Sequence, residues 1–529
     1  MPPRGPVIRL VGRSLATVLV IAGSVILLLM LLSGVVNREI VWTASPQRGA
    51  LAPLAPMRFA DSTAMFAAVD AYVADEMRAV RAPGLVIAIV HDRRIVHQRA
   101  LGYADTKSRR ITAETPFILG SLSKSFTAIA VVQLADEGKL ALDAPVQQYL
   151  SWFTVRDRDA ATKITIRQLL NHTSGLPKSA GLQLVRGAEA STGVEDARLV
   201  TNVRLHHAPG TTFEYSNANY WLLGLVIEAV TQGSYETYLR SHVLVPLAME
   251  HTYIDERIAE VHGLATGHRI WFGYPRAETL PYYWREMSVG YLISTADDMG
   301  RYLLAHLNGG SDGGAPVISA RGLAELHTPP AASPYAMGWL IDSVAGIPVL
   351  WHTGAVANYH GDMLIIPSSR WGVVLLSNVN NFILEGQLSD AVKGVAALLL
   401  GYAPPRQPWF RFRASYALIL AAALLWLTWR VWQVVRLRHW AREQRVMGPR
   451  SHAWLPAYPL VDPGVALGLL AGVPILLGSP ISTLRWFVPD LTDWMILNAV
   501  VAIAIAGVRI AFLKMASSSS PEAEPLRPM

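Results

Sequence analysis

Uncharged apolar runs stand at both ends of the chain and enclose a long segment of mixed polarity. One run lies near the N-terminus, at 15–36, and three lie near the C-terminus, at 414–429, 463–484 and 494–508. A helix needs about 20 such residues to cross a bilayer. The pattern predicts one N-terminal and three C-terminal transmembrane helices. The second and fourth runs are short, so a buried amphipathic helix is their alternative.

Basic residues flank these apolar runs unevenly. Five arginines against one glutamate follow the second run, at 436–450, whereas the loop at 485–493 holds one arginine and two aspartates. Basic loops stay on the cytoplasmic side, so we expect both chain ends in the cytoplasm. The long middle segment is then outside, in the periplasm, at a bacterial inner membrane. The first run is expected to be a retained anchor, with a cleaved signal peptide as the alternative.

The middle segment is predicted to have strands at both of its ends and helices between them. A helix is expected around 65–80, and alternating polarity predicts hairpins at 85–98 and 363–376. The stretch 121–296 is rich in helical patterns. Strand pairs at both ends of one domain predict an α+β fold, in which a single antiparallel sheet takes strands from both ends and the middle forms a helical subdomain.

These patterns divide the chain into six parts. They are, in order, a membrane anchor or signal, a Pro/Ala-rich linker, a globular domain, a second linker, three transmembrane helices and a disordered tail, at 1–40, 41–60, 61–400, 401–413, 414–514 and 515–529.

The amino-acid composition excludes several classes of function. The chain is 52% hydrophobic with a mean hydropathy of +0.29, above the roughly 45–50% apolar content of soluble domains. It has no cysteine, which excludes disulfides, a thiol nucleophile and cysteine-bound metal. The net charge of +7 comes with arginines beside apolar runs, which indicates membrane topology and not nucleic-acid binding. The fifteen histidines include no H-E-x-x-H pattern, so neither a metal nor a cofactor is expected.

The candidate nucleophile begins a predicted helix. Ser121 and Lys124 are three positions apart, so their side chains share one face about one turn from each other. Apolar residues recur every four positions to Leu134, and Gly138 ends the helix. The positive end of the helix dipole favours a serine alkoxide, and partial burial would lower the pKa of the lysine so that it acts as a base. The alternative is a serine N-cap with a solvated lysine.

Two later motifs complete a set in fixed order: Tyr215-Ser-Asn217 and His352-Thr-Gly354. With their flanking sequences, the three motifs resemble the penicillin-recognising serine hydrolases, a group of class C β-lactamases, D,D-carboxypeptidases, D-aminopeptidases and esterases. The resemblance covers 61–400 and implies a β-lactamase-like α+β domain. The flanking sequences are Phe117-Ile-Leu-Gly-Ser-Leu-Ser-Lys-Ser-Phe-Thr127, Leu169-Leu-Asn-His-Thr-Ser-Gly-Leu-Pro177 and Pro209-Gly-Thr-Thr-Phe-Glu-Tyr-Ser-Asn217.

The resemblance also implies a role for each residue. Ser121 is the nucleophile of an acyl-enzyme mechanism, and Lys124 and Tyr215 move its protons. The backbone amides of Ser121 and Ala355 form the oxyanion hole. For Asn358, a structural role in a turn is the alternative to substrate binding. The substrate-binding residues are Asn217, His352, Thr353, Gly354 and Asn358.

His352 departs from many relatives, which carry lysine there. A lysine gives a permanent cation for a substrate carboxylate, whereas histidine is neutral much of the time. Penicillins and peptide carboxy-termini present that carboxylate, so efficient β-lactam or carboxypeptidase turnover is not expected. D-aminopeptidases and esterases of the group commonly carry the histidine.

The order of the domains resembles peptidases that activate prodrugs and mature nonribosomal peptide products during export, a group that includes the colibactin maturation peptidase. We therefore expect a small peptide or acyl-amide substrate, specifically an N-acyl-D-aminoacyl amide. A general D-aminopeptidase, an esterase or a β-lactamase is the alternative. A β-lactam sensor is an alternative of another class, but the short cytoplasmic loop holds no recognisable effector domain.

The second C-terminal run, at 463–484, contains two overlapping G-x-x-x-G steps, formed by Gly464, Gly468 and Gly472. Such steps allow close helix contact, either inside the bundle, which we favour, or between two protomers. Pro474 follows them and is expected to kink the helix.

Overall fold

The computed structural model describes residues 55–181, 200–283, 286–404, 412–447, 458–476 and 479–518. The chain forms two compact units: a larger one at 37–413 and a smaller one that joins 1–36 to 414–529. The N-terminal apolar run and most of the first linker and of the tail lie outside the described residues.

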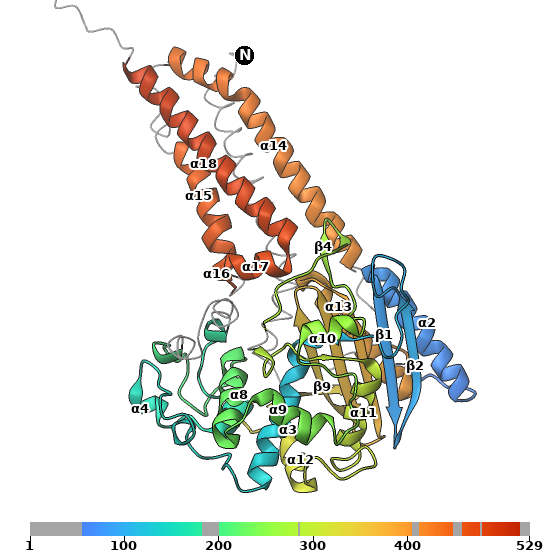
Figure 1. Cartoon of the computed structure of the whole chain (residues 1–529). Helices are drawn as coiled ribbons and strands as arrows, with labels where there is room; N and C mark the ends of the chain where they lie inside the picture. Colours follow the sequence, from blue (N-terminus) through green and yellow to red (C-terminus); the bar gives the residue numbers. More distant parts are fainter. Residues whose placement is uncertain are drawn as a thin grey trace, which may run out of the picture. The chain divides into compact units, whose positions relative to one another are not determined.

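A seven-stranded antiparallel sheet joins the two ends of the larger unit, in the order β2-β1-β11-β10-β9-β8-β7 (Figure 1). Strand β1 pairs with β11 from Leu85↔Ser377 to His91↔Trp371, so strands from both ends of the domain meet in one sheet. Both expected hairpins, β1–β2 and β10–β11, are confirmed. The strands are β1 (Gly84–His91), β2 (Arg94–Gly102), β7 (Tyr335–Ala336), β8 (Trp339–Val344), β9 (Ile347–Val356), β10 (Tyr359–Ile366) and β11 (Trp371–Ser377).

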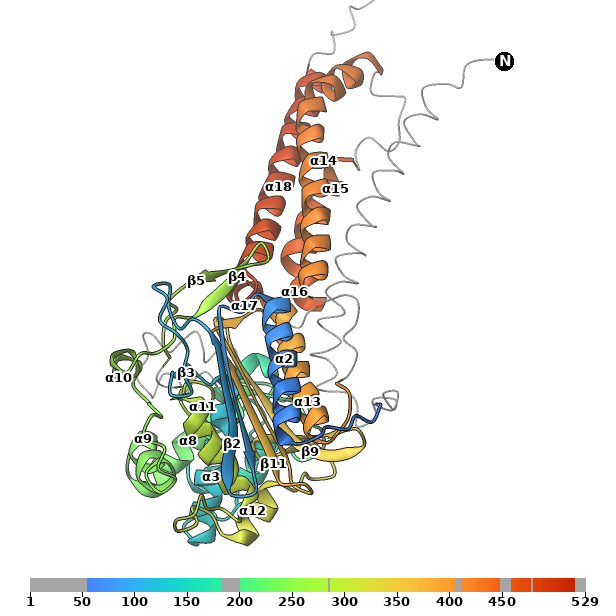
Figure 2. The ribbon, with the colours of Figure 1, turned by 90° about the vertical axis from the view of Figure 1, so that its right-hand side faces the viewer.

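Helices cover both faces of this sheet. Helices α2 (Ser62–Val80) and α13 (Phe382–Leu399) lie on one face, and α11 (Ala296–Leu307) lies on the other (Figure 2). Because both faces are covered, the first seven residues of β1 are all buried and form an unbroken apolar run. Helix α2 begins where Asp61 accepts a hydrogen bond from the amide of Ala64, a typical N-cap.

The middle of the chain is helical, as expected. Its principal helix, α3 (Ser123–Asp136), is buried along its first twelve residues and runs beside α8, α9 and α12. The sequence of this helix is apolar or small on all sides, which is typical of a helix enclosed by others. The other helices are α4 (Arg158–Ala161), α5 (Ile166–Leu170), α8 (Asn217–Thr231), α9 (Tyr235–Leu239), α10 (Glu256–Val261) and α12 (Ala320–Leu326).

One hairpin in this region was not expected from the sequence. Strands β4 (His268–Trp271) and β5 (Tyr274–Ala277) pair around Phe272 and Gly273, whose φ angles are 52° and 79°. A two-residue turn with two positive φ angles usually has the sequence Asn-Gly. Phe-Gly is not typical of such a turn, so the hairpin could not be recognised from its turn residues. Strand β4 also pairs in parallel with β12 (Val379–Asn380).

The smaller unit holds two helices that are long and apolar enough to cross a membrane, Phe412–Trp432 in α14 (Phe412–Met447) and Pro489–Ala511 in α18 (Pro489–Ser518). Both exceed the short apolar runs seen in the sequence. The run between them is not one straight helix: the helical pair Asp462–Leu476 and Ile481–Phe487 is bent by 77°. Three C-terminal spans are therefore reached only if this bent pair is a single span.

Charged side chains inside the smaller unit are paired with one another. Asp462 accepts hydrogen bonds from Arg430 at 2.5 Å and from Arg509, and all three side chains are buried. Such pairing is usual for ionisable groups in membrane helices, because an isolated charge there is costly. Among the described residues, no atom lies within 4 Å of a Cβ placed on Gly464, so no described helix packs closely on this glycine. The same holds for Gly468 and Gly472.

The orientation of the helices can be tested with reporter fusions. Fusions at Pro404, Met447 and Ser517 are expected to report outside, inside and inside, because the arginines between 436 and 450 favour the cytoplasm. Paired phosphatase and fluorescent-protein reporters at each position measure this directly. An outside reading at Met447 would contradict the crossing by α14.

Candidate active site

Ser121 lies in a tight turn that leads directly into α3. The turn, η1 (Gly120–Leu122), is followed by the α-helix from Ser123, two residues later than the predicted start. The hydroxyl of Ser123 fixes this junction, since it donates to the carbonyl of Gly120 at 2.8 Å and accepts from the amide of Leu292 at 3.2 Å. At the other end the helix stops at Asp136, and Gly138, two residues later, has the left-handed φ of 71° that is typical of a glycine ending a helix.

Lys124 is fully buried one turn after Ser121. Its Nζ donates to Ser121 Oγ at 2.9 Å and to the carbonyl of Val289 at 2.8 Å. Burial lowers the pKa of Lys124 to about 7, and the negative charge of Glu286 opposes that shift. A large part of the amine is therefore neutral near pH 7, and in that form it can accept the proton of Ser121.

Tyr215 forms a group of three side chains with Ser121 and Lys124. Its hydroxyl hydrogen-bonds to the side chain of Ser121, and Lys124 Nζ lies 5.1 Å from the centroid of its ring. Burial raises the pKa of Tyr215 above its usual range, although the bond to Ser121 lowers it. At neutral pH Tyr215 is thus a neutral phenol that can pass a proton on, and Lys124 is the group able to act as base.

Strand β9 passes close to the turn that holds Ser121, and two glycines make this approach possible. A Cβ on Gly120, whose φ is 58°, would lie 2.4 Å from the nitrogen of Ala355. A Cβ on Gly354 would lie 1.9 Å from the carbonyl oxygen of Leu119. The Ala355 amide therefore lies against the residue that precedes Ser121, an arrangement that can bring two backbone donors to one oxyanion.

His352 is held as a neutral imidazole. Its Nδ1 lies 2.6 Å from the carbonyl of Thr353 and its Nε2 lies 2.9 Å from the hydroxyl of Tyr335. A carbonyl can only accept, so Nδ1 carries the proton and Nε2 accepts from Tyr335. Burial lowers the pKa of His352 to about 3, and the nearby charge of Lys124 lowers it further. This position supplies no cation at physiological pH.

Two of the expected substrate-binding side chains point elsewhere. Thr353 Oγ1 accepts a hydrogen bond from Ser389 of α13 at 3.3 Å, because alternate residues of β9 face opposite sides of the sheet. Asn358 is buried, and its Nδ2 donates to the carbonyl of Glu278 at 3.1 Å. Asn358 thus takes the turn role that was its alternative. Asn217 begins α8, and its buried Oδ1 has no hydrogen-bond partner among the described residues.

His172 is a residue of this site that sequence reasoning missed. Its ring packs on that of Tyr215, with centroids 4.3 Å apart, and on that of Tyr335 at 4.7 Å. Its Nδ1 accepts from the amide of Ser216 at 3.2 Å and from Asn219 Nδ2 at 2.8 Å, which places its proton on Nε2. Burial lowers its pKa well below the usual range, so His172 is a neutral support for Tyr215.

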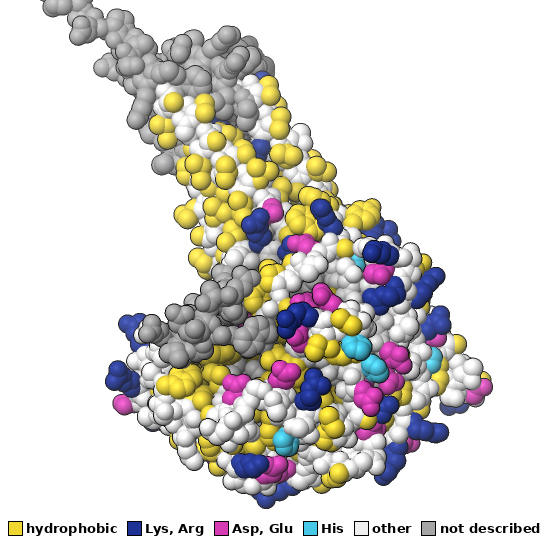
Figure 3. Space-filling model, viewed as in Figure 1, with side chains coloured by type: hydrophobic (Ala, Val, Ile, Leu, Met, Phe, Trp, Pro, Cys, Tyr) yellow, Lys and Arg dark blue, Asp and Glu magenta, His cyan; other side chains and the backbone are white. Residues whose placement is uncertain are grey.

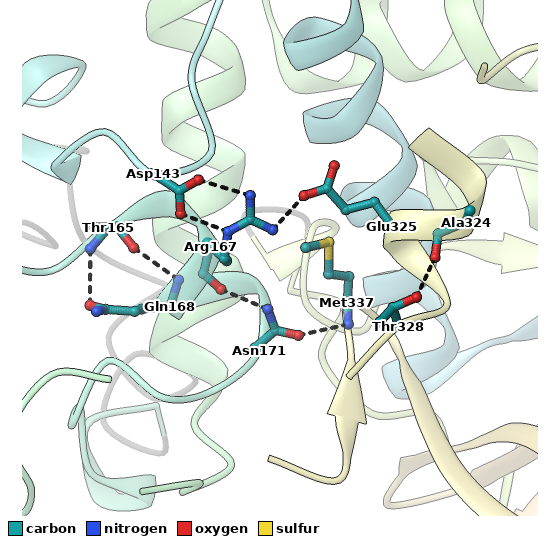
Figure 4. A network of polar contacts seen from close by, with 9 residues as sticks. All are labelled: Asp143, Thr165, Arg167, Gln168, Asn171, Ala324, Glu325, Thr328 and Met337. Atoms are coloured by element: carbon teal, nitrogen blue, oxygen red, sulfur yellow. Dashed lines mark hydrogen bonds and ion pairs between the residues drawn. The ribbon is translucent and has the colours of Figure 1, made fainter. Parts of the chain in front are cut away.

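Asn171 fixes the loop that carries His172 (Figure 4). Its Nδ2 donates to the carbonyl of Arg167 at 3.0 Å, and its Oδ1 accepts from the amide of Met337 at 3.3 Å. Both groups of the Asn171 amide thus satisfy backbone groups. Arg167 in turn binds Asp143 and Glu325, the latter at 2.5 Å. Arg167, Asn171 and Met337 also line a pocket of about 370 Å³, whose lining does not include Ser121.

The site and the sheet together define a class of protein. A serine at the start of a buried helix, a buried lysine one turn later, a tyrosine on the serine hydroxyl and a glycine-bearing sheet strand make a β-lactamase-like serine hydrolase site. The Beta-lactamase family matches residues 69–396, and the chain belongs to this family.

Similar proteins agree with this assignment. The chain is 29% identical over 320 residues to protein flp of Staphylococcus aureus (strain MW2), across 59% of this chain and 63% of flp. It is 28% identical over 354 residues to penicillin-binding protein 4 of Amycolatopsis lactamdurans, across 62% of this chain and 90% of that protein. The chain therefore spans less than two thirds of the length of flp.

Solved structures share the fold. The octameric penicillin-binding protein homologue from Pyrococcus abyssi superposes with a TM-score of 0.55 at 26% identity, across 66% of this chain and 80% of that chain. A second structure, described as SurE, gives a TM-score of 0.53 at 23% identity and shows the likeness of fold alone.

Proposed function

We propose that this protein is a membrane-anchored serine hydrolase that works through an acyl-enzyme in the periplasm. The observation that carries the proposal is the 2.9 Å contact between Ser121 Oγ and the buried amine of Lys124, whose pKa is lowered to about 7. A serine with a base of this kind is the minimum needed for covalent acyl transfer. The two long apolar helices support anchoring in a membrane.

The proposed acylation moves one proton and exchanges one bond. Neutral Lys124 takes the proton of Ser121 as Oγ attacks the substrate carbonyl, and the amides of Ser121 and Ala355 hold the resulting oxyanion. When the carbon–nitrogen bond breaks, Tyr215 donates its proton to the leaving nitrogen and recovers the proton that Lys124 took from Ser121. Water then attacks the ester, passes its proton back to Ser121 and releases the acid.

The edge of β9 supports an extended amide as the substrate. Strand β8 pairs with β9 only as far as Trp351, and among the described residues no strand pairs with that edge from His352 to Val356. An extended acyl-amide can add its backbone there. Because His352 is neutral, we propose that the enzyme prefers an N-acyl-D-aminoacyl amide, in a prodrug-activating role, over substrates that end in a carboxylate.

A matched pair of substrates tests this preference, one ending in an amide and the other in a carboxylate. Wild type is expected to have the higher kcat/KM for the amide. His352→Lys should improve the carboxylate member relative to the amide by about tenfold, the effect of one charge-assisted contact worth roughly 1.5 kcal/mol. His352→Gln is the neutral control and should leave the preference unchanged. The L-isomer of the amide tests the preference for D-amino acids.

Strong preference of wild type for the carboxylate member would contradict the proposal, because another cation would then bind it. Penicillin acylation is the second candidate activity, supported by the likeness to penicillin-binding protein 4 of Amycolatopsis lactamdurans. Stable labelling by a fluorescent penicillin without amide hydrolysis would favour that activity.

A further inference from the structure

The tip of the β4–β5 hairpin exposes large apolar side chains that the active site does not use. Phe272 is 57% exposed and Tyr274 is 61% exposed. At the end of the larger unit where β4 lies, apolar and basic side chains gather together (Figures 1 and 3). A contiguous apolar patch beside positive charge marks an interaction surface more often than a scattered single residue does.

The turn holds its phenylalanine in an unfavourable backbone conformation. The φ of Phe272 is 52°, a left-handed value that a bulky residue rarely adopts, and Gly273 follows at 79°. An asparagine in place of Phe272 would adopt this turn conformation with less strain and would expose a polar side chain to water. A strained, exposed aromatic residue at such a position is typical of a functional contact.

Arginines flank the exposed rings. Arg81 Nη1 donates to the carbonyl of Gly273 at 2.8 Å, and its guanidinium lies 3.9 Å from the centroid of the Tyr274 ring. The exposed Arg276 lies 5.9 Å from the ring of Trp271. Tryptophan and tyrosine prefer the boundary between lipid and water, and arginine binds lipid phosphates there. The chemistry of the tip matches the interfacial layer of a bilayer.

Contacts inside the larger unit connect this tip to the start of a membrane-spanning helix. The amide of Phe412, the first residue of the span, donates to Gln387 at 3.1 Å. Gln387 donates in turn to Glu76 of α2 at 2.8 Å. Glu76 precedes Arg81 by about one and a half helical turns, and Arg81 binds Gly273. A short series of contacts thus leads from the membrane entry to the hairpin.

We infer that the tip of the β4–β5 hairpin docks into the interfacial layer of the membrane that α14 enters. Phe272 and Tyr274 would lie at the level of the lipid headgroups, and Arg81 and Arg276 would bind their phosphates. This second attachment, beside the covalent one at Phe412, would limit how far the larger unit tilts over the bilayer. The inference rests on the membrane anchoring in the proposed function, and not on its chemistry.

Because the chain has no cysteine, one introduced thiol reports on one position. The full chain with Phe272→Cys, carrying an environment-sensitive fluorophore, is placed in nanodiscs whose lipids bear a quencher near the headgroup. The expected result is loss of its emission. The control is Val245→Cys, which is 67% exposed directly after η3 (Arg240–Leu244). This turn follows and contacts α9, and α9 lies away from β4 (Figures 1 and 2). The control should keep its emission.

Tyr274→Cys is the second reporter, in case Phe272→Cys folds poorly, and it should be quenched as well. Equal emission from either hairpin reporter and the Val245→Cys control would overturn the inference. Shielding that lipid quenchers do not affect, and that weakens as the protein is diluted, would overturn it in favour of a second copy of the chain. The readout is independent of hydrolysis, so its failure leaves the proposed reaction untouched.

Discussion

Replacing Ser121 with alanine is expected to abolish hydrolysis, with a loss on the order of 10⁶ in kcat, the scale found when a serine peptidase loses its nucleophile. Ser121 Oγ accepts a hydrogen bond from Lys124 and is hydrogen-bonded to Tyr215, so its removal takes away the hydroxyl on which both side chains converge. Covalent labelling by a fluorophosphonate should disappear as well, as measured by intact mass.

Ser125→Ala is the matched control for this variant. Ser125 lies in the same helix and is buried, but its hydroxyl donates to the backbone carbonyl of Leu122 at 2.8 Å and not to a side chain of the candidate site. This variant should retain labelling and most of the activity. Full labelling of the Ser121→Ala protein would show that the nucleophile lies elsewhere in the chain.

The pH dependence of acylation is expected to follow Lys124. Since the pKa of its amine is about 7 and the neutral form is the base, kcat/KM should fall about tenfold for each pH unit below 7 and level off above it. Lys124→Arg keeps the charge but cannot lose the proton, so it should cost about 10²–10⁴-fold. Steady-state rates between pH 5 and 9 measure both effects.

Titration of the histidines of the site cannot explain the expected fall in kcat/KM below pH 7. Burial lowers the pKa of His172 well below its usual range and that of His352 to about 3, so both stay neutral across the measured interval. If kcat/KM of the Lys124→Arg variant still falls below pH 7 as in wild type, the assignment of Lys124 as the base is contradicted.

Burial of Lys124 also links stability to pH. The unfolded chain holds this amine protonated up to about 10.5, whereas the folded chain releases the proton near 7. Between these values the unfolded state binds more protons, so the free energy of unfolding should rise with pH through that window. Below pH 7 the buried, protonated Lys124 therefore lowers the free energy of unfolding. Groups placed for catalysis often reduce stability in this way.

Local patterns in the sequence predict much of this molecule. The four-residue spacing of apolar positions places Ser121 and Lys124 one turn apart at the start of a buried helix. The alternating runs at 85–98 and 363–376 predict both hairpins that meet in the sheet. In each case the information lies within a few neighbouring residues.

The features that were not predicted depend on residues far apart in the chain. The state of His352 is set by Tyr335, which reaches it from β7, and the position of Tyr215 depends on the ring of His172. Neither pair has a spacing that a helix or a strand would reveal. Thr353 was assigned from the motif, yet the alternation of β9 turns its side chain toward α13.

The pairing of β1 with β11 has a consequence for the newly made protein. As the ribosome delivers the chain from its N-terminus, Ser121 and Lys124 emerge early, but Ala355 and the strands beside it emerge much later. Until Trp371 to Ser377 have been made and have paired with β1, the sheet lacks the pairing that joins the two ends of the domain. A nascent or truncated chain therefore carries its nucleophile without the means to use it.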